Sequence, residues 1–184
     1  MKQCYFFIFL FILLLLSGCL KQQNTTINEQ QAELTVHIEL VKEYFVNDSI
    51  LWLDPPEYIK NKRFDIQITL ENNSDTAIAF VKMTCSWKES FLINTPYIEY
   101  VDTECNSNYP QKVNVEAHEK YVLNTTLEQS KNHVTSSSSG TVMTKLGFIY
   151  VPSIGDSVRD YLSIMEDKSR WHIIWSNPLL LSKR

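Results

Sequence analysis

Apolar and polar residues alternate along much of the chain after residue 33. In residues 34–40, and again in residues 64–70, every second residue is apolar. A period of two predicts half-buried β-strands. Turn-forming residues follow at 71–75, and a third strand is predicted over 76–87, with Cys85 facing inward. Shorter segments predict further strands at 97–101, 113–115, 121–127, 142–150 and 171–175.

One segment departs from this period. Ser157 and Asp160 have the spacing of a helix-capping box, and Val158, Tyr161 and Met165 share one helical face. We therefore expect a short helix over residues 157–166. We expect it to lie over one open end of the sheets.

Strands recur at intervals near ten residues and are joined by turns. Seven to eight strands with one helix predict an all-β fold, an immunoglobulin-like antiparallel β-sandwich over residues 33–184. The strand, the turn Asn72-Asn73-Ser74-Asp75 and a long strand entering Trp87 resemble immunoglobulin-like domains of bacterial envelope proteins. Residues 63–127 are also similar to the small sandwich of the bacterial proteinase-inhibitor family named for its intracellular member. That similarity implies inhibition as an alternative function, without an inhibitory residue to carry over.

The N-terminus has the pattern of an export signal. Residues 5–16 are apolar and follow Lys2, and twelve helical residues span about 18 Å, which is short of the ~30 Å bilayer core. This is typical of a secretory signal, the alternative being an uncleaved anchor. Leu16-Ser17-Gly18-Cys19 resembles the bacterial lipobox. The resemblance implies removal of residues 1–18 and acylation of Cys19.

A membrane is therefore the first expected partner. Acyl chains on Cys19 would anchor the domain, and the polar residues 20–32 would form a flexible tether. Leu20 stands where inner-membrane retention signals typically have Asp. The resemblance thus implies the outer membrane if the cell has two membranes, and otherwise the outer face of the single one.

Two cysteines remain in the exported part, Cys85 and Cys105. In an oxidising compartment they are expected to form a disulfide, which would stabilise the fold by roughly 3 kcal/mol. Two buried free thiols are the alternative.

The charge argues against a nucleic-acid partner. The exported part has 16 basic and 21 acidic residues, a formal charge of −5. Its only basic cluster is the short segment Lys60-Asn61-Lys62-Arg63, which suits a solvated strand entry.

The sequence has few of the patterns that catalysis requires. The glycines are isolated, so a phosphate-binding loop is missing, and the usual nucleophile elbow is absent. His37, His118, His133 and His172 are scattered, and the acidic groups lack the spacing of a calcium loop. We expect neither catalytic residues nor a cofactor nor a metal site. The sequence favours a non-catalytic binding or assembly module with a protein or glycan partner in the envelope, over a hydrolase with dispersed site residues.

Two aromatic segments are candidates for binding. Trp52, Pro55, Pro56 and Tyr58 surround a rigid diproline between two strands. They are the better candidate binding loop, although Trp52 could plug the end of the sandwich instead. Trp171 and Trp175 share a face of the last strand, and this regular alternation favours a place in the core.

A covalent signal recurs three times. Ser49, Thr76 and Ser157 each stand between an aspartate and an apolar residue. This resembles the O-glycosylation signal of one group of envelope-rich bacteria. It implies three modified residues in loops, although three such matches can also arise by chance.

Overall fold

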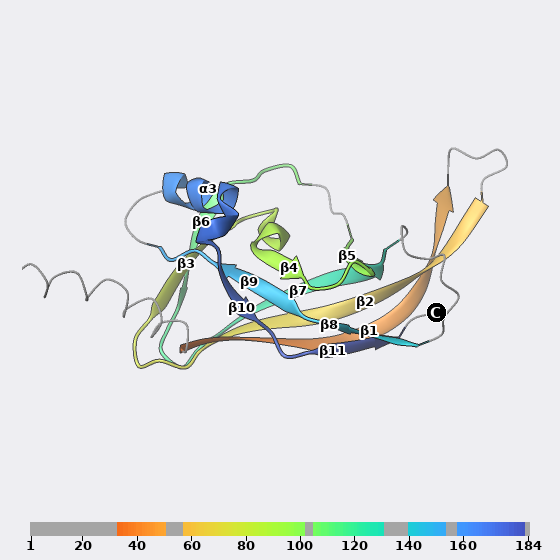
Figure 1. Ribbon diagram of the computed structural model, residues 1–184, viewed down its shortest axis with the longest axis horizontal. Helices are drawn as coiled ribbons and strands as arrows, with labels where there is room; N and C mark the ends of the chain where they lie inside the picture. Colours follow the sequence, from red (N-terminus) through yellow and green to blue (C-terminus); the bar gives the residue numbers. More distant parts are fainter. Residues whose placement is uncertain (1–32, 51–56, 102–104, 131–139, 154–157, 183–184) are drawn as a thin grey trace, which may run out of the picture. The chain divides into compact units, whose positions relative to one another are not determined.

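The computed structural model describes five segments of the chain, residues 33–50, 57–101, 105–130, 140–153 and 158–182. The compact unit Leu34–Arg184 is an antiparallel β-sandwich with one short α-helix in its described part, so the predicted all-β fold is confirmed (Figure 1). Among the described residues, no helix has the length and hydropathy needed to cross a membrane.

The first sheet has the strand order β1-β2-β7-β5. Its strands are Leu34–Ile50 (β1), Glu57–Asn72 (β2), Lys120–Gln129 (β7) and Ile98–Tyr100 (β5). Every second residue of β2 from Phe64 to Leu70 is buried, which matches the alternation of the sequence. One bulge between Leu40 and Lys42 shifts the register of β1.

The second layer consists of one sheet of order β10-β9-β4 and two strand pairs, β11-β8 and β3-β6. Its strands are Ile78–Met83 (β3), Phe91–Ile93 (β4), Pro110–Val115 (β6), Thr141–Thr144 (β8), Leu146–Tyr150 (β9), His172–Trp175 (β10) and Leu179–Ser182 (β11). Two 3₁₀ turns complete the described elements, Trp87–Ser90 (η1) and Lys168–Arg170 (η3).

Interrupted strands explain the number of short elements. β8 and β9 follow each other directly along the chain, and they pair with β11 and β10 respectively. β8 and β9 are therefore two halves of one bent strand, and β10 and β11 are two halves of its neighbour. β3 and β4 are likewise two parts of one strand, since β4 pairs with β9 and Phe80 of β3 bridges to Pro152, just after β9. If β1 is strand A, β2 is B, β3 with β4 is C, β5 is D, β7 is E, β8 with β9 is F and β10 with β11 is G, the two layers read A-B-E-D and C-F-G, the order of constant-type immunoglobulin sandwiches. β6 is an additional strand that pairs with β3.

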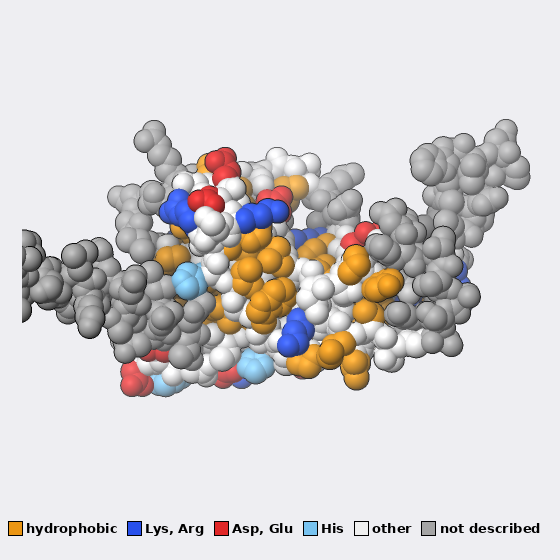
Figure 2. All heavy atoms as spheres, in the orientation of Figure 1, with side chains coloured by type: hydrophobic (Ala, Val, Ile, Leu, Met, Phe, Trp, Pro, Cys, Tyr) orange, Lys and Arg blue, Asp and Glu red, His pale blue; other side chains and the backbone are white. Residues whose placement is uncertain are grey.

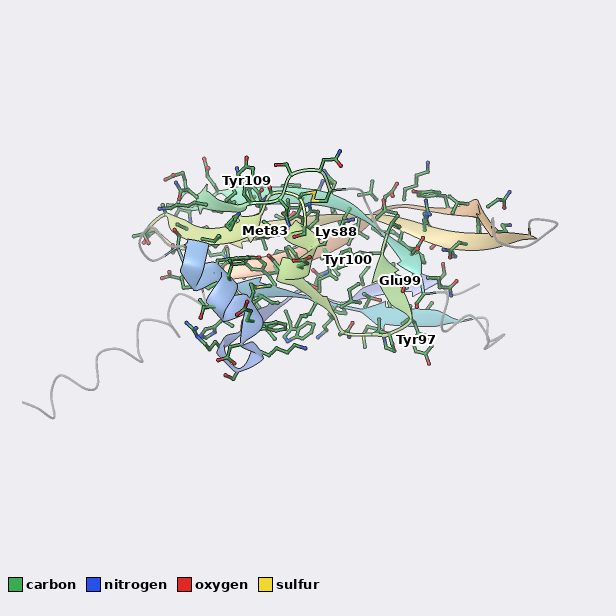
Figure 3. All side chains as sticks on the ribbon, turned by 90° about the horizontal axis from the view of Figure 1, so that it is seen from above. Met83, Lys88, Tyr97, Glu99, Tyr100 and Tyr109 are labelled. Carbon is green, nitrogen blue, oxygen red and sulfur yellow. A yellow bond between two sulfur atoms is a disulfide. The ribbon has the colours of Figure 1, made fainter. Side chains whose placement is uncertain are left out.

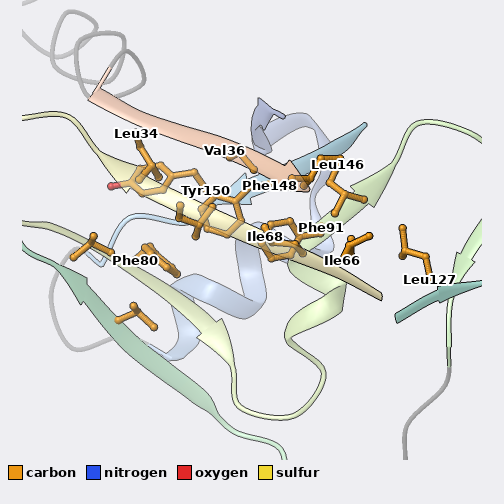
Figure 4. Packing of buried hydrophobic residues seen from close by; sticks show 14 of the residues in the cluster. Leu34, Val36, Ile66, Ile68, Phe80, Phe91, Leu127, Leu146, Phe148 and Tyr150 are labelled. Atoms are coloured by element: carbon orange, nitrogen blue, oxygen red, sulfur yellow. The ribbon is translucent and has the colours of Figure 1, made fainter. Parts of the chain in front are cut away.

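The core between the layers is aromatic at its centre (Figure 4). Phe148 packs against Phe80 and Phe91, with ring centroids 5.1 and 5.0 Å apart. The Phe80 contact is T-shaped, a favoured geometry for aromatic pairs. Gly147, beside Phe148, therefore faces the other side of the sheet, where the surface described below begins.

Helix α3 (Val158–Glu166) was expected from residue 157 onwards, and its presence is confirmed. Its expected place over an open end of the sheets is wrong. Tyr161 packs with Ile149 and Val151 in a second apolar cluster, so the helix covers part of the outer face of β9 and β10 (Figure 1). The reason is that Ile149 and Val151 form an outward apolar stripe that needs a cover.

The third predicted strand ends earlier than expected, at Met83. The side chain of Asn108 accepts hydrogen bonds from the backbone N–H groups of Cys85 and Ser86, at 3.2 and 3.1 Å. These donors are therefore satisfied without a neighbouring strand, and the chain turns into η1. Cys85 is half-buried rather than inward-facing.

The predicted strand 142–150 is two strands, and β4 and β11 were not predicted. The hydroxyl of Ser176 accepts the N–H of Leu146 at 3.0 Å, which replaces a backbone bond where the strand bends. Pro178 has no N–H to donate, so β11 resumes only after it.

Candidate functional site

The outer face of β10, β9 and β4 carries an exposed aromatic residue in a row of apolar residues. Trp175 pairs with Gly147, and Gly147 pairs with Leu92 on the other side, so the row crosses three strands. Trp175 is 46 % exposed, whereas Leu92 and Ile173 are half-buried. Figure 2 shows hydrophobic side chains gathered over these strands, below α3. We call Trp175, Gly147, Leu92 and Ile173 the aromatic face.

Gly147 makes this arrangement possible. A Cβ atom at residue 147 would lie 2.7 Å from Cγ2 of Ile173, and 3.0 and 3.1 Å from Cζ3 and Cε3 of Trp175. Two atoms of the six-membered ring of the indole therefore lie so close to residue 147 that only glycine fits there without a shift of its neighbours. Glycine inside a strand often marks such a close approach.

Two polar residues border the aromatic face. Lys145 lies between the buried Thr144 and Leu146, so its side chain is directed outward. Asn94 is exposed, and its side-chain Oδ1 accepts a hydrogen bond from the backbone N–H of Lys145 at 2.7 Å. The backbone N–H of Asn94 donates to the Lys145 carbonyl at 3.2 Å. The Asn94 amide group and the Lys145 ammonium group therefore remain as donors beside the row.

An open groove of about 610 Å³ begins at Leu92. Its walls include Ser86, Lys88, Glu89 and Tyr100, together with the disulfide. Lys88 Nζ donates to the Val101 carbonyl at 2.7 Å and lies 6.0 Å from the centroid of the Tyr100 ring (Figure 3). The groove thus combines an apolar floor with charges of both signs.

Tyr100 is the most strongly perturbed titratable group near this groove. Burial raises the pKa of its hydroxyl well above the usual range. The hydroxyl oxygen is buried and has no hydrogen-bond partner among the described residues. At neutral pH the Tyr100 hydroxyl is therefore protonated.

A second groove of about 500 Å³ lies on the outer face of the first sheet. It is polar, with Glu71 between Lys120 at 3.3 Å and His37 at 3.8 Å. His37 and Lys120 are exposed, and such pairs contribute little to stability. Asn177 lies at the border of this groove and makes two hydrogen bonds to the backbone of Ile38. The Asn177 side chain accepts the Ile38 N–H at 2.8 Å and donates to the Ile38 carbonyl at 3.0 Å.

The predicted cysteine pair is brought together. Cys85 and Cys105 form a disulfide with a Cα–Cα distance of 5.7 Å. It closes a loop that contains η1, β4 and β5, and its sulfur atoms border the groove.

Most residues of the predicted binding loop lie outside the described residues, namely Trp52, Pro55 and Pro56, and so does Cys19. Tyr58 is part of β2 rather than of the loop, because β2 begins at Glu57. The segment between the two strands is therefore shorter than the predicted loop.

The three predicted glycosylation residues have different positions. Thr76 is exposed in the loop between β2 and β3. Ser49 was expected in a loop, but it pairs with Tyr58 within the β1–β2 hairpin, because β1 continues past its bulge. Ser157 lies outside the described residues.

The histidines within the described segments are not gathered at one site. His118, in a left-handed backbone conformation with φ 60°, contacts Asp75 at 3.0 Å on an exposed loop. His172 is half-buried on β10, and His133 lies outside the described residues. In the described part of the chain, no three His, Cys, Asp or Glu residues are placed to hold a metal ion.

Trp171 and Trp175 were expected in the core, and this is wrong for Trp175, whereas Trp171 is half-buried and packs against the second apolar cluster. Their parity was right, but that parity points to the outer face, because Ile174 between them packs against the core. Trp171 is partly covered by α3 and donates from Nε1 to the Ile164 carbonyl at 3.0 Å, whereas Trp175 stays exposed. The sequence does contain one sign of this exposed tryptophan, Gly147, because a glycine among large residues of a strand often marks a close approach of a neighbouring side chain.

Fold and surface together define a disulfide-containing β-sandwich domain with an exposed aromatic face. No family model matches the sequence, and no curated protein matches it. Among solved structures, the chain is similar to a FixG-related protein from Vibrio parahaemolyticus, with 11% identity and a TM-score of 0.32. The match covers 81% of this chain and 96% of the other. A likeness of this degree supports no functional conclusion.

Proposed function

We propose that the protein is a lipid-anchored component of the bacterial cell envelope whose sandwich is a non-catalytic binding or assembly module. The lipobox Leu16-Ser17-Gly18-Cys19 after a short apolar stretch supports the anchor. The Cys85–Cys105 disulfide agrees with export into an oxidising compartment. Leu20 favours the outer membrane if the cell has two membranes.

The observation that carries the binding part of the proposal is the exposed indole of Trp175 over Gly147. Loops and faces of a rigid sandwich commonly carry binding, and tryptophan is enriched at the energetic centres of interfaces. Asn94 and Lys145 supply donors at the border, as binding sites with an apolar centre and a few polar groups require.

The segment that joins β1 to β2 remains a second candidate contact region, with Trp52, Pro55 and Pro56. β2 and β7 stop pairing at Arg63 and Glu128, whereas β1 and β2 continue to pair as far as Ile50 and Glu57. This hairpin therefore extends about 20 Å past the last β7 pair, at about 3.3 Å per residue.

A photo-crosslinking amino acid in place of Asn94 tests the proposal in intact cells. We expect a discrete crosslinked product in the membrane fraction from residue 94. The matched position is Asn124, which is exposed on the opposite sheet and whose side chain accepts a hydrogen bond from the half-buried Gln67. Equal products from both positions, or none from residue 94, would contradict binding through the aromatic face.

A further inference from the structure

The aromatic face is too small for a stable protein interface by itself. Neighbouring strands lie about 4.8 Å apart, so the row from Trp175 to Leu92 is about 10 Å long. Full burial of one aromatic side chain covers about 150–250 Å², whereas a stable protein interface buries about 800 Å² on each partner. The surface therefore fits a small ring-shaped ligand better than a second protein.

The position of Trp175 also argues against insertion into a membrane. Atoms Cε3 and Cζ3 of its six-membered ring approach Gly147, so this edge of the indole is packed on the sheet. A side chain that anchors in a bilayer has to project from the surface. Trp175 is nevertheless 46 % exposed, and we call this exposed part of the indole the platform.

The chemistry of the border points to a ligand rich in hydroxyl groups. The π face of an indole carries partial negative charge, so it attracts the C–H groups on the apolar side of a sugar ring. The Asn94 amide and the Lys145 ammonium lie beside the platform, where sugar hydroxyls can accept their hydrogen bonds.

The groove beyond Leu92 provides a continuation of the same surface. Leu92 belongs both to the row and to the groove wall, so the two are contiguous. Ser86 and Glu89 add a hydroxyl and a carboxylate there, and Lys88 adds a cation of opposite sign. Mixed charges suit a neutral ligand with many hydroxyls better than a strongly charged one.

We infer that the aromatic face binds a short neutral saccharide, with one sugar ring on Trp175 and the chain directed past Leu92 into the groove. This inference rests on the proposed function and names the ligand class of its binding face. Asn94 and Lys145 orient the sugar by hydrogen bonds, and Trp175 supplies most of the contact. The ligand is then a neutral segment of a polysaccharide or of a glycoconjugate.

The test uses the protein purified in detergent from the membranes of cells that produce it. A glycan array is screened first, followed by titration with chitohexaose, cellohexaose and maltohexaose under tryptophan fluorescence. We expect at least one neutral saccharide to bind, with Trp175→Ala weakening binding by about tenfold or more. Trp175→Phe should retain part of the affinity, because the ring remains. Asn94→Ala should weaken binding less than Trp175→Ala does.

Tyr109→Ala is the matched control, since Tyr109 is an exposed aromatic residue on the chain leading into β6. Its loss should leave saccharide binding unchanged. Absence of any binding glycan overturns the inference, and so does binding that is unaffected by both Trp175→Ala and Asn94→Ala. If residue 94 still crosslinks to a protein in cells while saccharides fail to bind, the proposed function stands and only the ligand class falls.

Discussion

Asn72 ends β2 in a fully buried position, and both ends of its carboxamide are hydrogen-bonded. Its Nδ2 lies within 2.8–3.0 Å of the carbonyls of Thr76, Val115 and Glu116, and its Oδ1 accepts from Ser74. One side chain thus joins the β2–β3 turn to the end of β6. The sequence signalled only a turn here, because the partners at 115 and 116 are remote along the chain.

Asn72→Ala is expected to lower the free energy of unfolding by about 3 kcal/mol or more, because several buried backbone groups lose their partner. Urea denaturation followed by circular dichroism measures it. Asn73→Ala is the control, because Asn73 is exposed and its side chain donates a hydrogen bond to the Thr35 hydroxyl, at 3.0 Å, rather than to buried backbone groups. A similar small effect for both variants would contradict the role of Asn72.

Gly147→Ala should destabilise the domain by about 1–3 kcal/mol, because the added methyl group would meet Ile173 at 2.7 Å. The same change should displace Trp175 and alter the near-ultraviolet circular dichroism. Gly140→Ala is the control, since nothing lies within 4 Å of a Cβ atom there. Unchanged stability and an unchanged tryptophan signal in Gly147→Ala would refute the close packing.

At the scale of elements, alternation was a good guide inside strands and a poor one at their ends. β1, β2 and β7 were predicted because one face of each is buried against the core. The boundaries at Met83 and Lys145 depend on side chains far away in sequence, Asn108 and Ser176. The row of the aromatic face was missed for a related reason, since parity alone does not say which of two faces is covered.

A small polar cluster joins the β1–β2 hairpin to β11, because Ser182 of β11 hydrogen-bonds to both Glu43 and Lys62. Lys62 and Ser182 hydrogen-bond to the carboxylate of Glu43, with Lys62 Nζ 2.7 Å and Ser182 Oγ 2.6 Å from it, and these bonds lower the pKa of Glu43. Its folded-state pKa therefore lies below the unfolded value near 4.5. The stabilisation is present above that value and is lost as the pH falls through the folded-state pKa.

Glu43→Gln should therefore cost stability at pH 7 but not in acid. Because Glu43 is partly exposed, we expect the cost to be under about 1 kcal/mol. The difference from the unaltered protein should shrink towards zero below about pH 4. Urea titrations at several pH values measure it, with Glu39→Gln on the same strand as the control for removing a carboxylate. A difference that grows in acid would contradict the contact.

The disulfide holds η1, β4 and β5 within one closed loop. Replacing both Cys85 and Cys105 by Ser should lower the free energy of unfolding by about 3 kcal/mol, because the unfolded chain regains the freedom of a 20-residue loop. Reductant should destabilise the unaltered protein to the same extent and leave the double variant unchanged. A double variant as stable as the unaltered protein would show that the loop is held by other contacts.

At the scale of the whole molecule, the proposed function combines a lipid anchor with a sandwich that presents an aromatic face. Net charge, the scattered histidines and the signal-like N-terminus could be read from the sequence, because each depends on composition or short local patterns. The face could not, because it is assembled from β4, β9 and β10, which meet only in the fold.

Acylation of Cys19 is the most direct test of the central claim, because a tethered envelope module requires it. Cells producing the protein are labelled with an alkyne analogue of palmitate, and the purified product is analysed by mass spectrometry. We expect a labelled product that lacks residues 1–18 and carries acyl chains on Cys19, and an unlabelled full-length precursor from Cys19→Ser. An unlabelled native protein, or labelling and processing of Cys19→Ser, would contradict the account.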